Sequence, residues 1–172
     1  MFLNKIKDFF TKKIVKKGLS NVKHIDSNNS IKTVGIVFDE SYFYEKESLI
    51  NELISNGIKS EAIQFFVFKN NIKKNDSFNY PVFSHKNINW NGTFDDKELN
   101  AFEATSFDLL ISYYDTEKAA LLLFTHLSKA TFKVGFSNID NRLNHFMINT
   151  NAENYKVFVE ELFKYLKILN KL

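Results

Sequence analysis

The sequence predicts an α/β protein, a Rossmann-like three-layer α/β/α sandwich with a mostly parallel sheet. The clearest indication is the stretch 107–136, in which an apolar run is followed by an alanine- and leucine-rich segment and then by a second β-prone run. The stretch 31–68 repeats this order with a different sequence. Strands that alternate with helical segments are typical of parallel sheets, because a parallel pair needs a long crossover connection.

The composition is that of one globular domain. Of 172 residues, 44% are hydrophobic, 25% are charged and 16% are aromatic, so a sizeable aromatic core is expected. Cysteine is absent, which excludes a disulfide framework, a thiolate metal site and a cysteine nucleophile. The net charge of +3 is weak evidence for nucleic-acid binding, because Arg142 is the only arginine and arginine is the residue favoured for phosphate recognition.

The first segment has a character of its own. Residues 1–17 have the spacing of a basic amphipathic helix that ends at Gly18, and lysines are concentrated there. Its apolar face holds Phe2, Leu3, Ile6, Phe9, Phe10 and Ile14, and the opposite face holds Lys5, Lys12 and Lys16. This helix could pack its aromatic face on the domain. Alternatively, it could contact an anionic membrane surface or a protein partner through Phe2, Ile6, Phe9, Phe10, Lys5, Lys12 and Lys16.

The predicted organisation is a helix over residues 1–18, a linker rich in Asn and Ser over residues 19–30, and a single α/β domain over residues 31–172. The domain begins with a strand over 31–39, whose continuous apolar run indicates burial on both faces. Gly35 within it indicates close packing by a helix or by backbone. A helix over 46–56 capped by Gly57 and a strand over 62–68 complete the first unit.

Residues 69–92 are dense in polar side chains, with short edge strands expected near 80–83 and 87–90. Thr93 and Asp96 have capping-box spacing ahead of a short helix. The second unit has a strand over 107–113, a helix over 116–130 and a strand over 132–136, in which Gly135 predicts contact with backbone or an aromatic ring.

A short strand near 145–149 follows, and Thr150 and Glu153 have capping-box spacing ahead of a helix that runs to the C-terminus. We expect its buried stripe to be Tyr155, Phe158, Leu162, Tyr165, Leu166 and Leu169.

Ligands of parallel sheets bind beyond the carboxyl ends of the strands, so the loops there hold the candidate ligand-binding residues. These are Asp39, Glu40, Ser41, Tyr113, Tyr114, Asp115, Asn138, Asp140 and Arg142. Two acids such as Asp39 and Asp115 could bind Mg²⁺ or act as acid and base. The alternative for Asp115 is a helix N-cap with no further role. Strand alternation places one of Tyr113 and Tyr114 in the core and the other toward the loops.

Known catalytic and cofactor motifs are missing. The loop from Asp39 to Lys46 lacks glycine, which excludes a dinucleotide fingerprint and a P-loop at that place. The four histidines are scattered, and no Gly-x-Ser-x-Gly motif occurs. No metal site is assigned, and the sequence identifies no cofactor.

Two resemblances add expectations. The runs Phe107–Ile111, Ala119–Leu122 and Phe132–Phe136 resemble the N-terminal domain of heptosyltransferase-type glycosyltransferases of the GT-B fold, which implies a Rossmann-like acceptor-side domain. The basic Phe-rich N-terminus, the strands at 33–39, 108–113 and 132–135 and the terminal run Glu161–Leu166 look like a Bacteroidetes family known only as a domain of unknown function. That resemblance implies a bacterial source and no activity.

The expected function is a non-catalytic binding or interaction module, peripheral to the inner membrane if residues 1–17 bind lipid. The alternative is a small enzyme, or a degenerate glycosyltransferase-like half domain that binds a nucleotide or sugar at the carboxyl edge of the sheet. We expect a cytoplasmic location, because lysines interrupt the N-terminal apolar residues. The longest strongly apolar run, Ala119–Phe124, is also far shorter than the roughly 20 residues that span a membrane.

Overall fold

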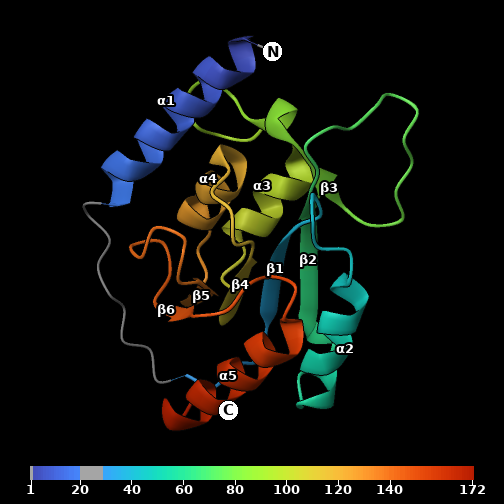
Figure 1. Cartoon of the computed structure of the whole chain (residues 1–172), viewed down its shortest axis with the longest axis vertical. Coiled ribbons are helices and arrows are strands. Elements are labelled where there is room, and N and C mark those ends of the chain that lie inside the picture. The colour runs from blue at the N-terminus through green and yellow to red at the C-terminus, as the bar shows by residue number, and fades with distance from the viewer. Residues whose placement is uncertain (1, 20–28) are drawn as a thin grey trace.

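The computed structural model describes residues 2–19 and 29–172. Within these residues one parallel sheet of six strands has the order β3-β2-β1-β4-β5-β6 (Figure 1). This is the strand order of the classical dinucleotide-binding fold, and it confirms the predicted Rossmann-like architecture. The strands are β1 (Val34–Asp39), β2 (Ile63–Phe68), β3 (Val82–Phe83), β4 (Leu109–Tyr113), β5 (Phe132–Phe136) and β6 (Phe146–Ile148).

Helices cover both faces of the sheet. On one face α4 (Ala119–Leu127) packs against α1 (Phe2–Leu19) and α3 (Lys97–Ala104), and on the other α2 (Lys46–Ser55) packs against α5 (Tyr155–Ile168) (Figure 1). Short 3₁₀ turns are η1 (Ser60–Ala62) and η2 (His85–Asn87). The chain leaves β1 toward β2 and leaves β4 toward β5, so the topological switch point lies between β1 and β4.

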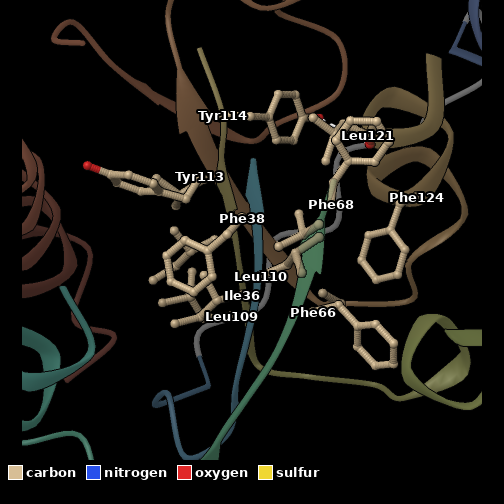
Figure 2. Close-up of a cluster of buried hydrophobic side chains, with 14 of the residues drawn as sticks. Ile36, Phe38, Phe66, Phe68, Leu109, Leu110, Tyr113, Tyr114, Leu121 and Phe124 are labelled. Atoms are coloured by element: carbon tan, nitrogen blue, oxygen red, sulfur yellow. Dashed lines mark hydrogen bonds between the residues drawn. The ribbon is translucent and has the colours of Figure 1, made fainter. Parts of the chain in front are cut away.

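The aromatic residues form two layers, one on each side of the sheet. Figure 2 shows Phe38 and Tyr113 on one side, and Phe66, Phe68 and Phe124 on the other. All residues of β1 and β4 are buried, as expected for strands that are covered on both faces. The buried stripe of α5 is Phe158, Val159, Leu162, Phe163 and Leu166, whereas Leu169, which we expected to be buried, is 41% exposed.

Two strand glycines make room for side chains. A Cβ at Gly35 would lie 2.8 Å from the Phe107 ring, and a Cβ at Gly135 would lie 2.5 Å from Nδ2 of Asn144. The predicted close approach is therefore present at both positions. Its cause differs from the prediction, because a ring meets Gly35 and a side-chain amide meets Gly135.

The predicted helix starts are wrong in detail. Asp96 itself caps α3, with Oδ1 accepting from the Leu99 backbone N–H at 2.9 Å, so the capping box with Thr93 does not form. The N-cap of α5 is Asn154, whose side chain makes no capping hydrogen bond. The capping box predicted for Thr150 and Glu153 is therefore also wrong. The N-cap of α4 is Lys118, not Asp115.

Two further expectations concern the edge strand at 87–90 and the linker over residues 19–30. In the segment 87–90, Ile88 makes only an isolated antiparallel bridge to Phe94, so the second edge strand is absent from the described part of the chain. The predicted linker over residues 19–30 overlaps α1 at Leu19, and its residues 20–28 lie outside the described residues.

Candidate functional site

The switch point brings together the residues that follow β1 and β4. Phe38 pairs with Tyr113 in adjacent strands, so Asp39 and Tyr114 come next to each other at the carboxyl edge. The predicted position of these site residues at one edge of the sheet thus follows from the register. What their side chains contact decides whether they are free for a ligand.

Asp39 is neutralised by a lysine at the start of α4. Its carboxylate is 2.6 Å from Nζ of Lys118, which also donates to Oγ of Ser41 at 2.6 Å. Asp39 is 2% exposed, and the backbone N–H of Ser41 donates to its Oδ1 at 3.0 Å. Lys118 therefore occupies the position where a metal ion or substrate cation would meet Asp39.

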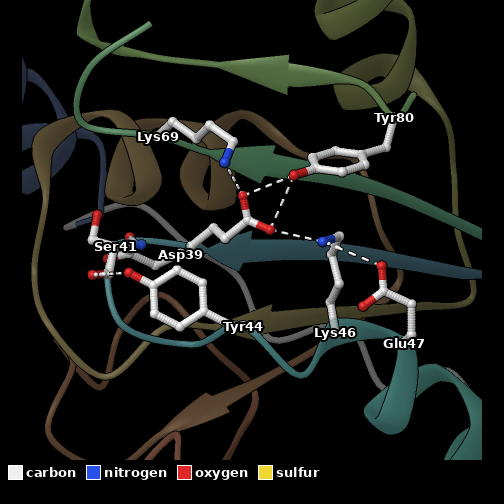
Figure 3. A network of polar contacts seen from close by, with 8 residues as sticks. Asp39, Ser41, Tyr44, Lys46, Glu47, Lys69 and Tyr80 are labelled. Atoms are coloured by element: carbon white, nitrogen blue, oxygen red, sulfur yellow. Dashed lines mark hydrogen bonds and ion pairs between the residues drawn. The ribbon is translucent and has the colours of Figure 1, made fainter. Parts of the chain in front are cut away.

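Glu40 is the centre of a second buried network. Lys46 donates to Oε1 at 2.7 Å, Tyr80 donates to Oε2 at 2.9 Å, and Lys69 forms an ion pair with the same carboxylate. Figure 3 shows Lys46, Lys69 and Tyr80 converging from different segments of the chain. Nζ of Lys46 also lies 4.1 Å from the centre of the Tyr80 ring, a cation–π contact.

The pKa values of this network follow from its contacts. Burial would raise the pKa of Glu40, but the hydrogen bonds from Lys46, Lys69 and Tyr80 outweigh burial and hold the pKa below its ordinary value. Burial likewise acts to lower the pKa of Lys46, and its bonds to Glu40 and Glu47 raise the pKa instead. Both groups are therefore charged at neutral pH and compensate each other.

The two tyrosines lie in the core on opposite faces of the sheet. The Tyr113 hydroxyl donates to the Ala152 carbonyl at 2.7 Å, and the Tyr114 hydroxyl is 2.7 Å from Oγ1 of Thr125. Both side chains are at most 1% exposed, and burial raises the pKa of each hydroxyl. The prediction that one of them faces the loops is wrong, because the connections after β1 and β6 cover Tyr113 and α4 covers Tyr114.

The remaining candidates stabilise loops. Asp115 accepts from the Ala152 backbone N–H at 2.9 Å, and its own carbonyl accepts from Nδ2 of Asn138 at 2.6 Å. Arg142 pairs with Asp140 at 2.6 Å, and this bond lowers the pKa of Asp140. The structure thus joins Asp115 to Asn138, and it leaves Asp140 and Arg142 as a separate pair.

A shallow cavity of about 350 Å³ lies beyond the carboxyl edge. Among the nine candidates only Asp115 lines it, and the other lining residues are Tyr42, Phe43, Thr116, Asn151, Ala152 and Glu153. The lysines that pair with the acids, Lys46, Lys69 and Lys118, are absent from the sequence-based candidates. Consecutive acids at the end of a buried strand do indicate that cations must be near, but they do not select among the many lysines.

Within the described residues no cluster of histidine, aspartate and glutamate could hold a metal ion. The profile of a family of unknown function, DUF6913, matches residues 7–169. The chain belongs to this family. A search of curated proteins and a search of solved structures find no match to the chain.

The DUF6913 match includes most of α1. The side of α1 that is buried against the domain differs from the one that the sequence predicted. The side chains turned to α4 and its surroundings are Thr11, Val15 and Leu19, each at most 5% exposed. Phe9 is 65% exposed and Phe10 is 47% exposed. The interpretation that the aromatic face packs on the domain is therefore wrong for these two residues. The side chain of Phe2 lies outside the described part.

The outward face of α1 combines aromatic rings with lysines. Phe9 and Phe10 meet edge to face with 5.8 Å between ring centroids, and Lys5, Lys13, Lys16 and Lys17 are exposed. Lys12 instead turns toward the domain and donates to the Glu117 carbonyl at 3.3 Å. A Cβ at Gly92, in a neighbouring turn, would lie 3.1 Å from the Ile14 side chain. No helix of the described residues is long and apolar enough to cross a bilayer.

Proposed function

We propose that this protein is a non-catalytic module that binds the anionic inner surface of a membrane through the outward face of α1. The observation that carries the proposal is the exposure of Phe9 and Phe10 beside four exposed lysines. Interfacial helices place aromatic side chains at the boundary between headgroups and acyl chains, while flanking lysines extend toward anionic headgroups.

The magnitudes favour a reversible, peripheral attachment. A fully buried Phe side chain contributes about 1.5–3 kcal/mol, and each lysine near an anionic surface contributes about 1 kcal/mol. The buried stripe of Val15 and Leu19 holds the helix on α4, so the rings are presented from a folded surface and the helix need not order on binding. The neutralised acids at the sheet edge support a non-catalytic role.

The double variant Phe9→Ser/Phe10→Ser in the full chain is expected to bind phosphatidylserine-containing vesicles at least about tenfold more weakly than the parent. Partial burial of one ring already accounts for about 1.4 kcal/mol, which corresponds to a factor of ten. The measurement is cosedimentation at low salt. Parent binding should also weaken as salt rises, because salt screens the lysine charges.

The matched control is Val157→Ser/Ile168→Ser, which removes comparably exposed side chains, 46% and 63%, from α5. This control is expected to retain binding, and both double variants are expected to keep the parent's unfolding midpoint. Equal losses in the two double variants, or parent binding to neutral vesicles that salt does not weaken, would contradict the proposal.

A second candidate function rests on the cavity of about 350 Å³ at the switch point. Its position is where folds with this strand order bind nucleotides, which favours the nucleotide- or sugar-binding half domain. A nucleotide or nucleotide sugar that raises the unfolding midpoint, and that loses this effect in a Thr116→Trp variant that fills the cavity, would favour this function.

A further inference from the structure

A second cavity lies on the α4 side of β5. Its volume is about 280 Å³, and it shares no lining residue with the switch-point cavity. The lining residues are Leu19, His126, Lys133, Asn141, Arg142, Leu143, Asn144 and His145, and we call it the β5 cavity. Its size is slightly below that of typical cofactor pockets, so it suits a small molecule.

Asn144 is the observation that indicates a ligand. The residue is 5% exposed, and both its Oδ1 and its Nδ2 are buried with no hydrogen-bond partner among the described residues. Its amide lies against Gly135, where a Cβ would come within 2.5 Å of Nδ2. Buried side-chain amides are nearly always hydrogen-bonded, and an unsatisfied amide that lines a cavity can be completed by a bound group.

Lys133 supplies a positive charge to the same cavity. Its Nζ donates to the Thr125 carbonyl at 2.7 Å, and it forms no ion pair with an acid in the described part of the chain. Burial lowers the pKa of Lys133 to about 8, so the side chain is mostly charged at neutral pH. A partly buried cation without a counter-ion is stabilised when an anion joins it.

The other charged and titratable groups in the lining also favour an anion. No carboxylate is among the lining residues. Arg142 also lines the cavity, and its guanidinium forms an ion pair with Asp140. Burial and the nearby charge of Lys133 lower the pKa of His126, so its imidazole is mostly neutral and can donate one hydrogen bond. The lining thus combines donors with net positive charge.

Backbone contacts hold Lys133 and Asn144 in place. The backbone N–H of Lys133 donates to Nδ1 of His145 at 2.9 Å, and the backbone N–H of His145 donates to the Lys133 carbonyl at 2.8 Å. The His145 ring also stacks on Phe132 at 5.7 Å. The loop before β6 is therefore fixed to β5, so the two groups need little rearrangement to act together.

We propose that the β5 cavity binds the phosphate group of a small molecule, with Lys133 as the charged ligand and Asn144 as the amide donor. Charge-assisted hydrogen bonds from a lysine, together with neutral donors, are a common means of holding a phosphate. This site does not require the membrane contact proposed above, because its ligating side chains lie on β5 and on the loop that precedes β6, and α1 contributes only Leu19 to the lining.

Thermal unfolding and calorimetry of the full chain test the site, with inorganic phosphate and glycerol 3-phosphate as probes. Either probe is expected to raise the unfolding midpoint above that in sodium chloride of equal ionic strength. Lys133→Met is expected to lower the affinity for the probe at least about tenfold, because it removes the charge and keeps the apolar stem. Asn144→Leu is expected to weaken binding as well.

Lys156→Met on α5 is the matched control, since this lysine is exposed and far from the lining, and it should bind as the parent does. Without a probe, Lys133→Met should remain folded with at most a small loss of stability from the missing bond to the Thr125 carbonyl, so loss of binding would not reflect unfolding. Tighter binding of glycerol 3-phosphate would identify a phosphate monoester as the ligand, and equal binding would identify phosphate itself. Equal midpoints in phosphate and chloride, or unchanged affinity in Lys133→Met, would overturn the proposal.

Discussion

Glu40→Ala is expected to lower the free energy of unfolding by about 3–5 kcal/mol, the usual cost of removing one partner of a buried ion pair. The side chains of Glu40 and Lys46 are 5% and 7% exposed. Without the carboxylate, Lys69 would lose its counter-ion and Lys46 would keep only the exposed Glu47. Urea unfolding at neutral pH measures the loss.

The control for this prediction is Glu161→Ala, which breaks the exposed pair with Lys164 and should leave the midpoint unchanged. The effect of Glu40→Ala should also depend on pH. The folded pKa of Glu40 is below its ordinary value of 4.5, so its contribution is complete above that value and is lost as the pH falls through the folded pKa. A loss at neutral pH no larger than that of Glu161→Ala would show that the network is not the buried centre described here.

Tyr113→Ala is expected to lower the free energy of unfolding by about 3–5 kcal/mol, because it leaves a large cavity in the aromatic layer. The centroid of the ring lies 4.7 Å from that of Phe43, 5.0 Å from that of Phe158 and 5.1 Å from that of Phe136. Denaturant unfolding with matched m-values is the measurement.

Tyr113→Phe separates the hydroxyl from the ring. It keeps the packing and removes only the bond to the Ala152 carbonyl, so its expected loss is about 1–3 kcal/mol. Tyr44→Ala, at a residue that is 69% exposed, should change little. If Tyr113→Ala were as mild as Tyr44→Ala, Tyr113 would not belong to the buried aromatic layer.

The fold was predictable from the sequence because buried parallel strands have a distinctive pattern. The continuous apolar run of β1 and the run of β4 indicate strands covered on both faces, and the order of elements then restricts the topology. Helix starts were harder to predict. Asp115 looked like an N-cap from its local sequence, yet its carboxylate binds the Ala152 backbone N–H, a contact distant in the sequence.

The packing of α1 shows that the spacing of apolar residues does not always predict which face of a helix is buried. The more hydrophobic stripe, with Phe9 and Phe10, was the natural choice for the core, but the narrower stripe of Thr11, Val15 and Leu19 is buried. Gly18 explains part of the choice, because a Cβ there would lie 2.4 Å from the His126 imidazole, so a larger residue would require this ring to shift.

The candidate residues follow the carboxyl ends of the strands, as the strand pattern predicts, but the contacts of their side chains could not be predicted. The positions of Asp39 and Glu40 follow from the end of β1. Their neutralisation by Lys118 and Lys46 depends on which lysines the fold brings near. Asn144 and Lys133 gave no sequence signal, because the missing partners of the Asn144 amide and the missing counter-ion of Lys133 are properties of the folded chain.

The most direct measurement of membrane attachment uses a tryptophan on the outward face of α1. Phe10→Trp in a Trp90→Phe background places the sole tryptophan of the chain beside Phe9. With phosphatidylserine vesicles brominated in the acyl chains, its fluorescence is expected to be quenched and shifted to shorter wavelength. Val157→Trp in the same background should be unaffected. Unquenched emission from the α1 tryptophan at lipid concentrations that sediment the protein would contradict insertion of this face.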